Sequence, residues 1–353
     1  MTQVLTFLLR RALQGLGVIW GIVSLLFVIF YALGDPTAYL VEDNADEATK
    51  AAIRAKYGLD QPLFQQYLNY LNDLSPIGTL EVAEKTEVSH LALWAGETGL
   101  FAIKAPQLGR SYQTGGAVAS MVGSRLFGTA LLAVTAIVLA ALLGIGLGVI
   151  AALNHQTFWD KSILSLSVLG ISAPSFFIGV LFAWLFAVYW GDWTGLNMSG
   201  FVLEENIFSP GNHWVGKNLL LPALALGIRP LAVFIQLTRS SMIEVWGQDY
   251  IRTGRAKGLG PIPLLIRHAL RNALNPVMTS VTGWLASLLA GAFFIEYIFG
   301  WQGIGKLTID ALNTNDFPVI IACAMTVGLI FVGVSILTDL LYAYLDPRVK
   351  VAG

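Results

Sequence analysis

The sequence predicts an all-α polytopic membrane protein with six transmembrane helices and an extracytoplasmic insertion between the first and second. Two observations predict this class. Only 12% of the 353 residues are charged and 56% are hydrophobic, whereas a soluble domain carries about 25% charged residues. Six stretches are also apolar for long enough to cross a bilayer, which takes about 20 residues. Lipid solvates such an apolar exterior, and water does not. The composition therefore excludes an ordinary soluble domain.

Each apolar stretch is expected to form one membrane helix. The first follows Arg10 and Arg11 and is longer than the core of a signal peptide, about 7–15 residues, so we expect an uncleaved span. Pro174 predicts a kink in the third stretch, and Pro222 and Pro230 interrupt the fourth. The six stretches are Leu13–Leu33, Phe127–Leu153, Ser162–Trp190, Leu219–Met242, Val277–Phe299 and Val319–Tyr344.

The insertion between the first two stretches has mixed local patterns. Ala45–Tyr57 and Gln61–Leu74 favour short helices, with Asn44 or Asp46 near the N-cap of the first. The stretch Ser75–Gln107 has no clear period, and we expect loop or short strands there. The chain is thus expected to divide into the N-terminus and first span (1–33), the extracytoplasmic domain (34–126) and a core with five further spans (127–353).

The distribution of Lys and Arg predicts the orientation of the spans, because short cytoplasmic loops carry an excess of these residues. With a cytoplasmic N-terminus, the short outer loops hold only Lys217 and Lys306. Both termini are therefore expected in the cytoplasm. The inner segments then hold Arg10, Arg11, Lys161, Arg239, Arg252, Arg255, Lys257, Arg267, Arg271, Arg348 and Lys350.

No catalytic, metal or cofactor site is expected. The single cysteine, Cys323, lies in an apolar run, and the four histidines are scattered without metal-ligand spacing. No Ser/His/Asp, Cys/His or paired-carboxylate arrangement stands in a plausible site. Nothing in the sequence predicts a nucleic-acid partner. The chain is therefore not expected to be an enzyme.

The long inner loop, 239–276, is the most informative segment. Residues 250–257 favour a short helix that ends at Gly258 and Gly260, and residues 264–274 favour a second, amphipathic helix. Spacing alone leaves two interpretations open. The loop is either a basic hairpin that rests on anionic lipid or an element that binds a partner protein.

This loop resembles the EAA loop of ABC-importer permeases, in the variant of the dipeptide/oligopeptide/nickel permease family. Gly254 stands where the variant usually has Ala, a departure that should loosen the helix by up to about 1 kcal/mol. Further likeness extends over nearly the whole chain and weakens at residues 75–107. The matching loop residues are Ser241, Met242, Glu244, Val245, Asp249, Tyr250, Ile251, Arg252, Thr253, Arg255, Ala256, Lys257, Gly258, Leu259, His268, Ala269, Leu270, Arg271, Asn272, Ala273, Leu274 and Pro276.

The resemblance implies a type I ABC-importer permease fold and the role of a permease subunit in a bacterial-type inner membrane. It implies that ATP is hydrolysed in two separate cytoplasmic ATPase subunits, that a second homologous permease completes a heterodimer, and that an extracytoplasmic binding protein delivers the solute. That solute would be a peptide, a nickel complex or glutathione. The ATPase-coupling residues would be Glu244, Asp249, Tyr250, Arg252, Ala256, Lys257 and Gly258.

Four residues are candidates for the translocation path. Arg229 lies within the fourth stretch, where a charge is costly and suggests function; an internal ion pair or snorkelling is the alternative. Glu296 near the end of the fifth stretch is such a candidate or a structural carboxylate at a helix end. Ser172 and Ser175 flank Pro174 and are expected to line the path.

Three further patterns carry alternatives. The run Gly300–Lys306 matches the first seven positions of a nucleotide-binding glycine-rich loop, but Leu307 replaces the required Ser or Thr, so we expect an outer re-entrant turn. Gly17/Gly21 and Gly144/Gly148 have the spacing of close helix contacts, either within the chain or with another subunit. A secondary transporter or channel would need a repeat or intramembrane acids that the sequence does not display.

Overall fold

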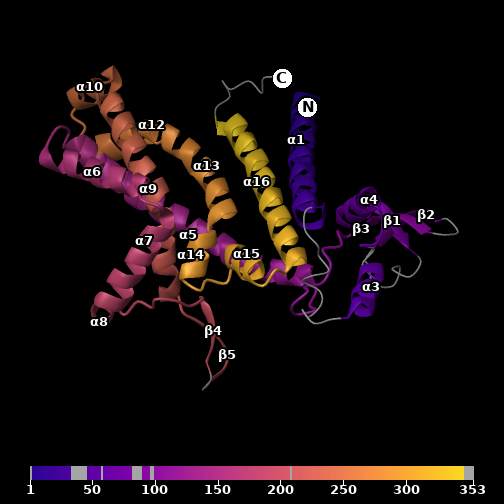
Figure 1. Cartoon of the computed structure of the whole chain (residues 1–353). Coiled ribbons are helices and arrows are strands. Elements are labelled where there is room, and N and C mark those ends of the chain that lie inside the picture. The colour runs from indigo at the N-terminus through magenta and orange to yellow at the C-terminus, as the bar shows by residue number, and fades with distance from the viewer. Residues whose placement is uncertain are drawn as a thin grey trace. The chain divides into compact units, whose positions relative to one another are not determined.

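The computed structural model describes residues 2–32, 46–56, 59–81, 90–95, 99–206 and 209–345 (Figure 1). The chain divides into two compact units. The core unit comprises Leu126–Lys306 with Met1–Leu8 and Ile330–Gly353, and the second unit comprises Leu9–Arg125 with Leu307–Leu329. Three long helices, α1 (Thr2–Phe27), α5 (Val118–Leu153) and α16 (Phe317–Leu345), have residues in both units.

Most of the core unit is helical, and its longest helix is α9 (Lys217–Trp246). The other elements, in chain order, are α6 (Phe158–Ser172), α7 (Ser175–Phe182), the π-helical segment η3 (Ala183–Tyr189), α8 (Gly191–Thr194), β4 (Leu203–Asn206), β5 (Ser209–Trp214), α10 (Asp249–Ala256), α11 (Pro261–Pro263), the π-helical segment η4 (Leu264–Leu270), α12 (Arg271–Ala273), α13 (Asn275–Gly291), α14 (Phe293–Ile298) and α15 (Ile304–Asn313), the last of which crosses into the second unit.

Glycines let α5 and α9 approach each other closely. A Cβ on Gly144 would lie 2.7 Å from the Cβ of Phe234, and a Cβ on Gly148 would lie 2.6 Å from the Cβ of Thr238. Neither position tolerates a side chain without separating the helices. The glycine spacing on α5 is therefore explained by contact within the chain, one of the two predicted alternatives. By contrast, a Cβ on Gly17 or Gly21 of α1 would meet no described atom within 4 Å.

The predicted kink at Pro174 is confirmed. Helix α6 ends at Ser172, α7 begins at Ser175, and the two directions differ by 110°. Proline cannot donate a backbone hydrogen bond and disfavours helical geometry in the preceding residue. Ala173 accordingly has extended backbone angles, with φ −76° and ψ 137°. The third apolar stretch is thus a bent pair of helices.

The apolar lengths of the helices agree with a polytopic membrane protein. Within the described ranges, four helices are long and apolar enough to cross a membrane, and the bent pair makes a fifth. The four lie in α1, α5, α9 and α16, at the first, second, fourth and sixth predicted stretches. The predicted fifth stretch divides between α13 and α14 at Ala292, which leaves α13 with 17 residues.

The second unit includes the short helices and sheet of the predicted insertion. Helices α3 (Glu47–Lys56) and α4 (Leu63–Leu74) occur where the sequence predicts them. Asp46 caps α3, because its Oδ1 accepts a hydrogen bond of 3.1 Å from the backbone N–H of Thr49. The side-chain and backbone hydrogen bonds from Thr49 hold the pKa of the Asp46 carboxyl below its usual value.

The strands of the second unit form one antiparallel sheet in the order β1-β3-β2. The strands are β1 (Ile77–Glu81), β2 (His90–Ala95) and β3 (Gly99–Lys104), and Ile77 pairs with Ile103. The expectation of short strands in Ser75–Gln107 is thus confirmed. The all-α class omits this sheet and a second one, the β4–β5 hairpin of the core unit, which the sequence analysis missed.

Two contacts hold distant parts of the second unit together. Aromatic rings pack where α1 meets α4, with 5.1 Å between the ring centres of Phe27 and Tyr67 and 5.5 Å between those of Phe27 and Tyr70. Burial raises the pKa of the Tyr70 hydroxyl. At the start of α16, the Asp316 carboxylate accepts hydrogen bonds from the Ser111 hydroxyl and from the Tyr112 backbone N–H, the latter at 3.0 Å.

Candidate functional site

Helix α9 continues to Trp246, so the first residues of the predicted loop 239–276 are helical. The remaining part, residues 247–274, is here named the basic hairpin. Its first helix, α10, turns back at Gly258, whose φ of +79° favours glycine. Residues 261–273 then form a nearly continuous helical return through α11, η4 and α12. Both predicted helices of the hairpin are confirmed, with a π-helical stretch in the second.

A small hydrophobic core holds the basic hairpin against the ends of two long helices. Met242 of α9 packs with Ile251 of α10 and with Leu264 on the return, and Val149 and Ala152 of α5 lie against this core. Ile251 is fully buried. Tyr250 and Asn272 link the two sides of the hairpin, because the Asn272 amide donates a hydrogen bond of 2.8 Å to the Tyr250 hydroxyl. The hairpin is therefore a packed element and not a loose connection.

Gly254 shows why this hairpin has glycine at that position. A Cβ there would lie 2.8 Å from Cδ1 of Leu264 and 3.4 Å from Cδ1 of Leu259. Glycine therefore allows α10 to approach the return helix closely. Both neighbouring atoms are the ends of leucine side chains, which can turn aside.

The other face of α10 is exposed. Asp249 and Arg252 are paired at 3.4 Å on the surface, and Tyr250 is 43% exposed. Arg255 places its guanidinium over the ring of Trp246, 5.1 Å from the ring centre. All seven predicted coupling residues are exposed: Glu244 on the last turn of α9, and Asp249, Tyr250, Arg252, Ala256, Lys257 and Gly258 on α10 and its end.

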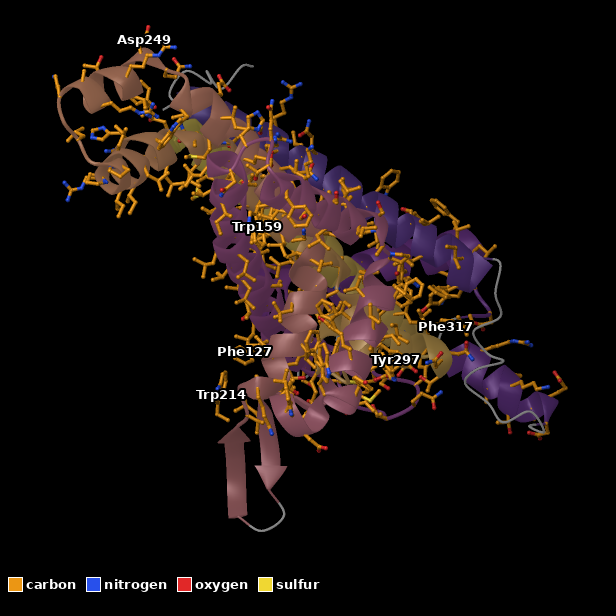
Figure 2. The ribbon with its side chains drawn as sticks, turned by 90° about the vertical axis from the view of Figure 1, so that its left-hand side faces the viewer. Phe127, Trp159, Trp214, Asp249, Tyr297 and Phe317 are labelled. Carbon is orange, nitrogen blue, oxygen red and sulfur yellow. The ribbon has the colours of Figure 1, made fainter. Side chains whose placement is uncertain are left out.

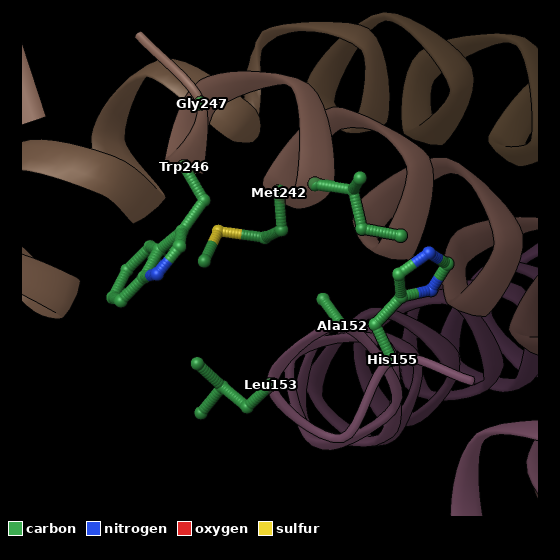
Figure 3. Close-up of a pocket in the computed structure, with 7 residues that line it drawn as sticks. Ala152, Leu153, His155, Met242, Trp246 and Gly247 are labelled. Carbon is green, nitrogen blue, oxygen red and sulfur yellow. The ribbon is translucent and has the colours of Figure 1, made fainter. Parts of the chain in front are cut away.

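A cavity of about 270 Å³ lies beside the base of the basic hairpin (Figure 3). Its walls are mostly apolar, and the His155 ring and the Trp246 indole stand on opposite sides of it. Its lining residues are Ala152, Leu153, His155, Met242, Ile243, Trp246 and Gly247. The ends of α5 and α9 and the first residue of the basic hairpin thus form this cavity.

Glu296 lies in a second polar cluster of the core unit and is fully buried. Its Oε1 accepts a 2.7 Å hydrogen bond from the Thr129 hydroxyl, and its Oε2 accepts one of 3.1 Å from the backbone N–H of Lys306. The Thr129 oxygen in turn accepts a 2.9 Å bond from the N–H of Ile304. Together these side chains satisfy N–H groups in the first turn of α15, which would otherwise lack partners.

This cluster explains the pattern that resembles a nucleotide-binding loop. Gly303 and Gly305 lie so close to the Glu296 carboxylate that a Cβ on either would come within 3 Å of it. A helix N-terminus with glycines commonly binds an anion, and here the carboxyl group of Glu296, from the same chain, occupies that place. Trp301 fixes the turn further by donating a 2.8 Å hydrogen bond from Nε1 to the carbonyl of Gly128.

The two sites lie far apart within the core unit. Asp249 on α10 marks one end of the unit, and Trp214 and Tyr297 lie toward the other (Figure 2). Because Tyr297 directly follows Glu296, the Glu296 cluster lies with it, away from the basic hairpin.

The comparisons with known proteins identify the family. The model of the binding-protein-dependent transport system inner membrane component matches residues 144–351, and the model of its N-terminal region matches residues 4–133. The chain belongs to this family. It is a transport permease of the inner-membrane component type, and its mostly helical fold agrees with that.

Three relatives match the permease over nearly its full length. The dipeptide transport system permease protein DppB of Escherichia coli K12 is 33% identical, with 98% of this chain and 99% of the relative covered. The protein of the same name from Bacillus subtilis is 35% identical, with 98% and 97% covered. The di/tripeptide transport system permease protein DppB of Pseudomonas aeruginosa is 33% identical, with 98% and 99% covered.

The structure does not bring the four predicted path residues of the permease into one cluster. Ser172 and Ser175 lie on the two sides of the bend, and the Ser172 hydroxyl donates to the carbonyl of Val168 at 2.9 Å. The Arg229 side chain is exposed on α9. Glu296 is enclosed by its hydrogen bonds, which favours the structural alternative for this residue. The role of all four stays a prediction.

Sequence reasoning missed two groups of polar residues in this permease. Thr129, which holds the Glu296 cluster, carries no motif that marks it, and Trp301 stands at a variable position of the glycine-rich run Gly300–Lys306. Asp160 of α6 forms an ion pair with Arg239 of α9. The sequence analysis used Arg239 only as one of the positive charges that predict the orientation of the spans. These partners are far apart in the sequence, so no local pattern brings them together.

Proposed function

We propose that this permease forms half of the translocation path of an ATP-driven importer for dipeptides and other short peptides. The names of its relatives support the peptide substrate, because these relatives cover almost the whole chain. Nickel complexes and glutathione are the competing solutes. The chain would hydrolyse no ATP itself.

The observation that carries this proposal is the two-sided character of α10. Ile251 and Gly254 are buried against the return helix and the end of α9. The opposite face is free, charged and partly aromatic. A helix that is fixed on one side and exposed on the other can receive force from a partner and pass it inward. In this proposal the partner is an ATPase subunit, and the coupling residues are those of the exposed face.

The remaining parts of the proposal concern assembly. Two cytoplasmic ATPase subunits, a second homologous permease and an extracytoplasmic binding protein complete the importer. The permease crosses the inner membrane six times with both termini in the cytoplasm, and residues 34–126 form the extracytoplasmic domain. The bent pair α6–α7 and the segment α13–α14 count as the third and fifth spans. Arg229, Ser172 and Ser175 line the path.

A reconstituted importer tests the substrate and the energy source together. The permease is purified with its partner subunits, placed in liposomes with the binding protein, and supplied with a labelled dipeptide, a nickel chelate or glutathione. We expect ATP-dependent uptake of the dipeptide above the other two. Uptake without ATP by this chain alone would overturn the proposal in favour of a secondary transporter, and selective uptake of either competitor would overturn the peptide assignment.

The variant Ala256→Glu tests the docking face directly. Ala256 is exposed on α10, so a longer acidic side chain leaves the core of the hairpin intact and obstructs a partner. We expect membrane insertion to be unchanged and dipeptide uptake per ATP hydrolysed to fall on the order of tenfold. The control is Ala51→Glu, which changes an exposed alanine of α3. Full uptake by the Ala256→Glu importer would show that α10 does not dock the ATPase.

A further inference from the structure

A polar joint connects α6 and α9 at the end nearest the basic hairpin. Asp160, in the first turn of α6, receives two hydrogen bonds from Arg239 of α9. The Arg239 Nε lies 2.5 Å from Oδ1, and Nη2 lies 2.8 Å from Oδ2. Such a bidentate contact fixes both the distance between the two helices and their relative orientation, because the guanidinium and the carboxylate are both planar.

The surroundings of Asp160 hold its carboxylate in place. The backbone N–H of Gln156 donates to Oδ2 at 2.9 Å, and Gln156 adopts a φ of +65°, which is uncommon for a residue other than glycine. His155 Nδ1 lies 3.0 Å from Nη2 of Arg239. The side chain of Asp160 is only 2% exposed and that of Arg239 20%. Because its partners cover the carboxylate, loss of the contact with Arg239 would leave its charge without compensation, so the pair resists separation.

The ion pair is one end of a continuous contact between the two helices. Further along, the Gln236 amide donates a 3.3 Å hydrogen bond to the Ser167 hydroxyl. Beyond that, Gly170 of α6 lets the helices come close, since a Cβ there would lie 3.3 Å from Cγ1 of Ile228. Helix α6 is therefore in contact with α9 from Asp160 to Gly170.

The basic hairpin reaches α6 through α9. Met242, in the core of the hairpin, lies one turn beyond Arg239 on the same helix. In the described part of the chain, the residues of that core come from α5, α9 and the hairpin itself, and none comes from α6. The hairpin is thus packed on α9 and on the end of α5, and Arg239 is the polar contact from α9 to α6 that lies closest to it.

We propose that the Asp160–Arg239 pair is the joint that transmits movement of the basic hairpin to α6 and hence to the bent third span. This inference rests on the proposed function, in which an ATPase moves the hairpin. Asp160 and Arg239 are positioning residues, because they act through the helices that they join and not on the transported solute.

The test compares transport with ATP hydrolysis in the complete importer in liposomes, with a labelled dipeptide as the probe. Asp160→Asn removes the charge but keeps the shape, Arg239→Gln removes the other partner, and Asp160→Arg with Arg239→Asp exchanges the two. Lys161→Gln, next to the pair and exposed, is the matched control. A variant that does not accumulate is replaced by Arg239→Lys, which keeps the charge but cannot make the bidentate contact.

We expect both single variants to hydrolyse ATP in response to the binding protein while uptake per ATP falls on the order of tenfold. The exchanged pair should recover part of that loss, and the control should match the wild type. The single variants are compared at equal amounts of assembled importer. If their ratio of uptake to ATP hydrolysis is unchanged, the proposed role of the Asp160–Arg239 pair is wrong. Parallel losses of both activities without recovery in the exchanged pair would also contradict that role. Absence of ATP-dependent uptake in the wild type would instead count against the proposed function.

Discussion

Glu296 is fully buried, and its carboxylate caps the N-terminus of α15. A cap is normally supplied by the residue just before the helix. The residue before α15 is Gly303, which has no side chain to accept a hydrogen bond. The Glu296 carboxylate and the Thr129 hydroxyl supply the missing acceptors from α14 and α5. A negative charge at a helix N-terminus is further favoured by the helix dipole.

The variant Glu296→Gln tests this capping role. The amide nitrogen brings hydrogen-bond donors toward backbone N–H groups that also donate, and the negative charge is lost. We expect the free energy of unfolding to fall by about 1–3 kcal/mol, seen as a lower thermal midpoint of the detergent-solubilised permease. Asp192→Asn, which changes an exposed acid in α8, should leave the midpoint unchanged. Equal midpoints for both variants would contradict the assigned role.

Single residues were predictable where the physical reason is local. The N-cap at Asp46 and the turn at Gly258 depend on neighbouring residues only, and both agree with the sequence. The Asp160–Arg239 pair was not predictable, since its members lie 79 positions apart and only the packing of α6 on α9 joins them. Glu296 had two interpretations because its hydrogen bonds come from α5 and from the start of α15, which no local pattern places beside it.

At the scale of elements, the contact between α5 and α9 depends on single glycines. In Gly148→Ala the added Cβ would lie 2.6 Å from the Cβ of Thr238 and 2.8 Å from the backbone oxygen of Ile235. Backbone atoms cannot turn aside, so the helices must separate. We expect the variant to lose about 1–3 kcal/mol of stability, measured as a lower thermal midpoint and a lower yield of folded protein.

The neighbouring position provides the control for that prediction. Gly146→Ala adds the same methyl group to the same helix, but no described atom lies within 4 Å of it. Alanine also has a higher helix propensity than glycine. The Gly146→Ala permease should therefore be at least as stable as the wild type. A Gly148→Ala permease that matches it would mean that α5 and α9 are not in close contact at this point.

Most of the long hydrophobic patterns in the sequence correspond to long helices in the structure. The apolar stretches at α1, α5, α9 and α16 and the break at Pro174 appear as predicted. The predicted interruption of the fourth stretch was wrong, because α9 continues through Pro222 and Pro230 as one helix. The β4–β5 hairpin was missed, because its strands are too short for a period-2 pattern to stand out. The predicted fifth span is divided at Ala292, where the apolar pattern continues and gives no sign of a break.

At the scale of the whole molecule, the proposed orientation places the basic hairpin in the cytoplasm and α3 outside. Cysteine labelling tests this. The native Cys323 is fully buried, so the unsubstituted chain should not react with a membrane-impermeant maleimide. We expect Ala51→Cys to be labelled from the outer side in intact spheroplasts, and Asp249→Cys to be labelled only after the membrane is opened. Labelling of Asp249→Cys in intact spheroplasts would reverse the orientation.

The glycine-rich turn before α15 has a consequence for how such a molecule meets its surroundings. In a receptor for a free phosphate, occupancy depends on the concentration of that phosphate. Here the anion is tethered to the same chain, so its effective concentration at the turn is fixed and cannot be diluted. Ions in the surrounding water cannot compete for a place that is already filled. The segment resembles part of a phosphate-binding loop, but a side chain of the same protein occupies the place of the ligand.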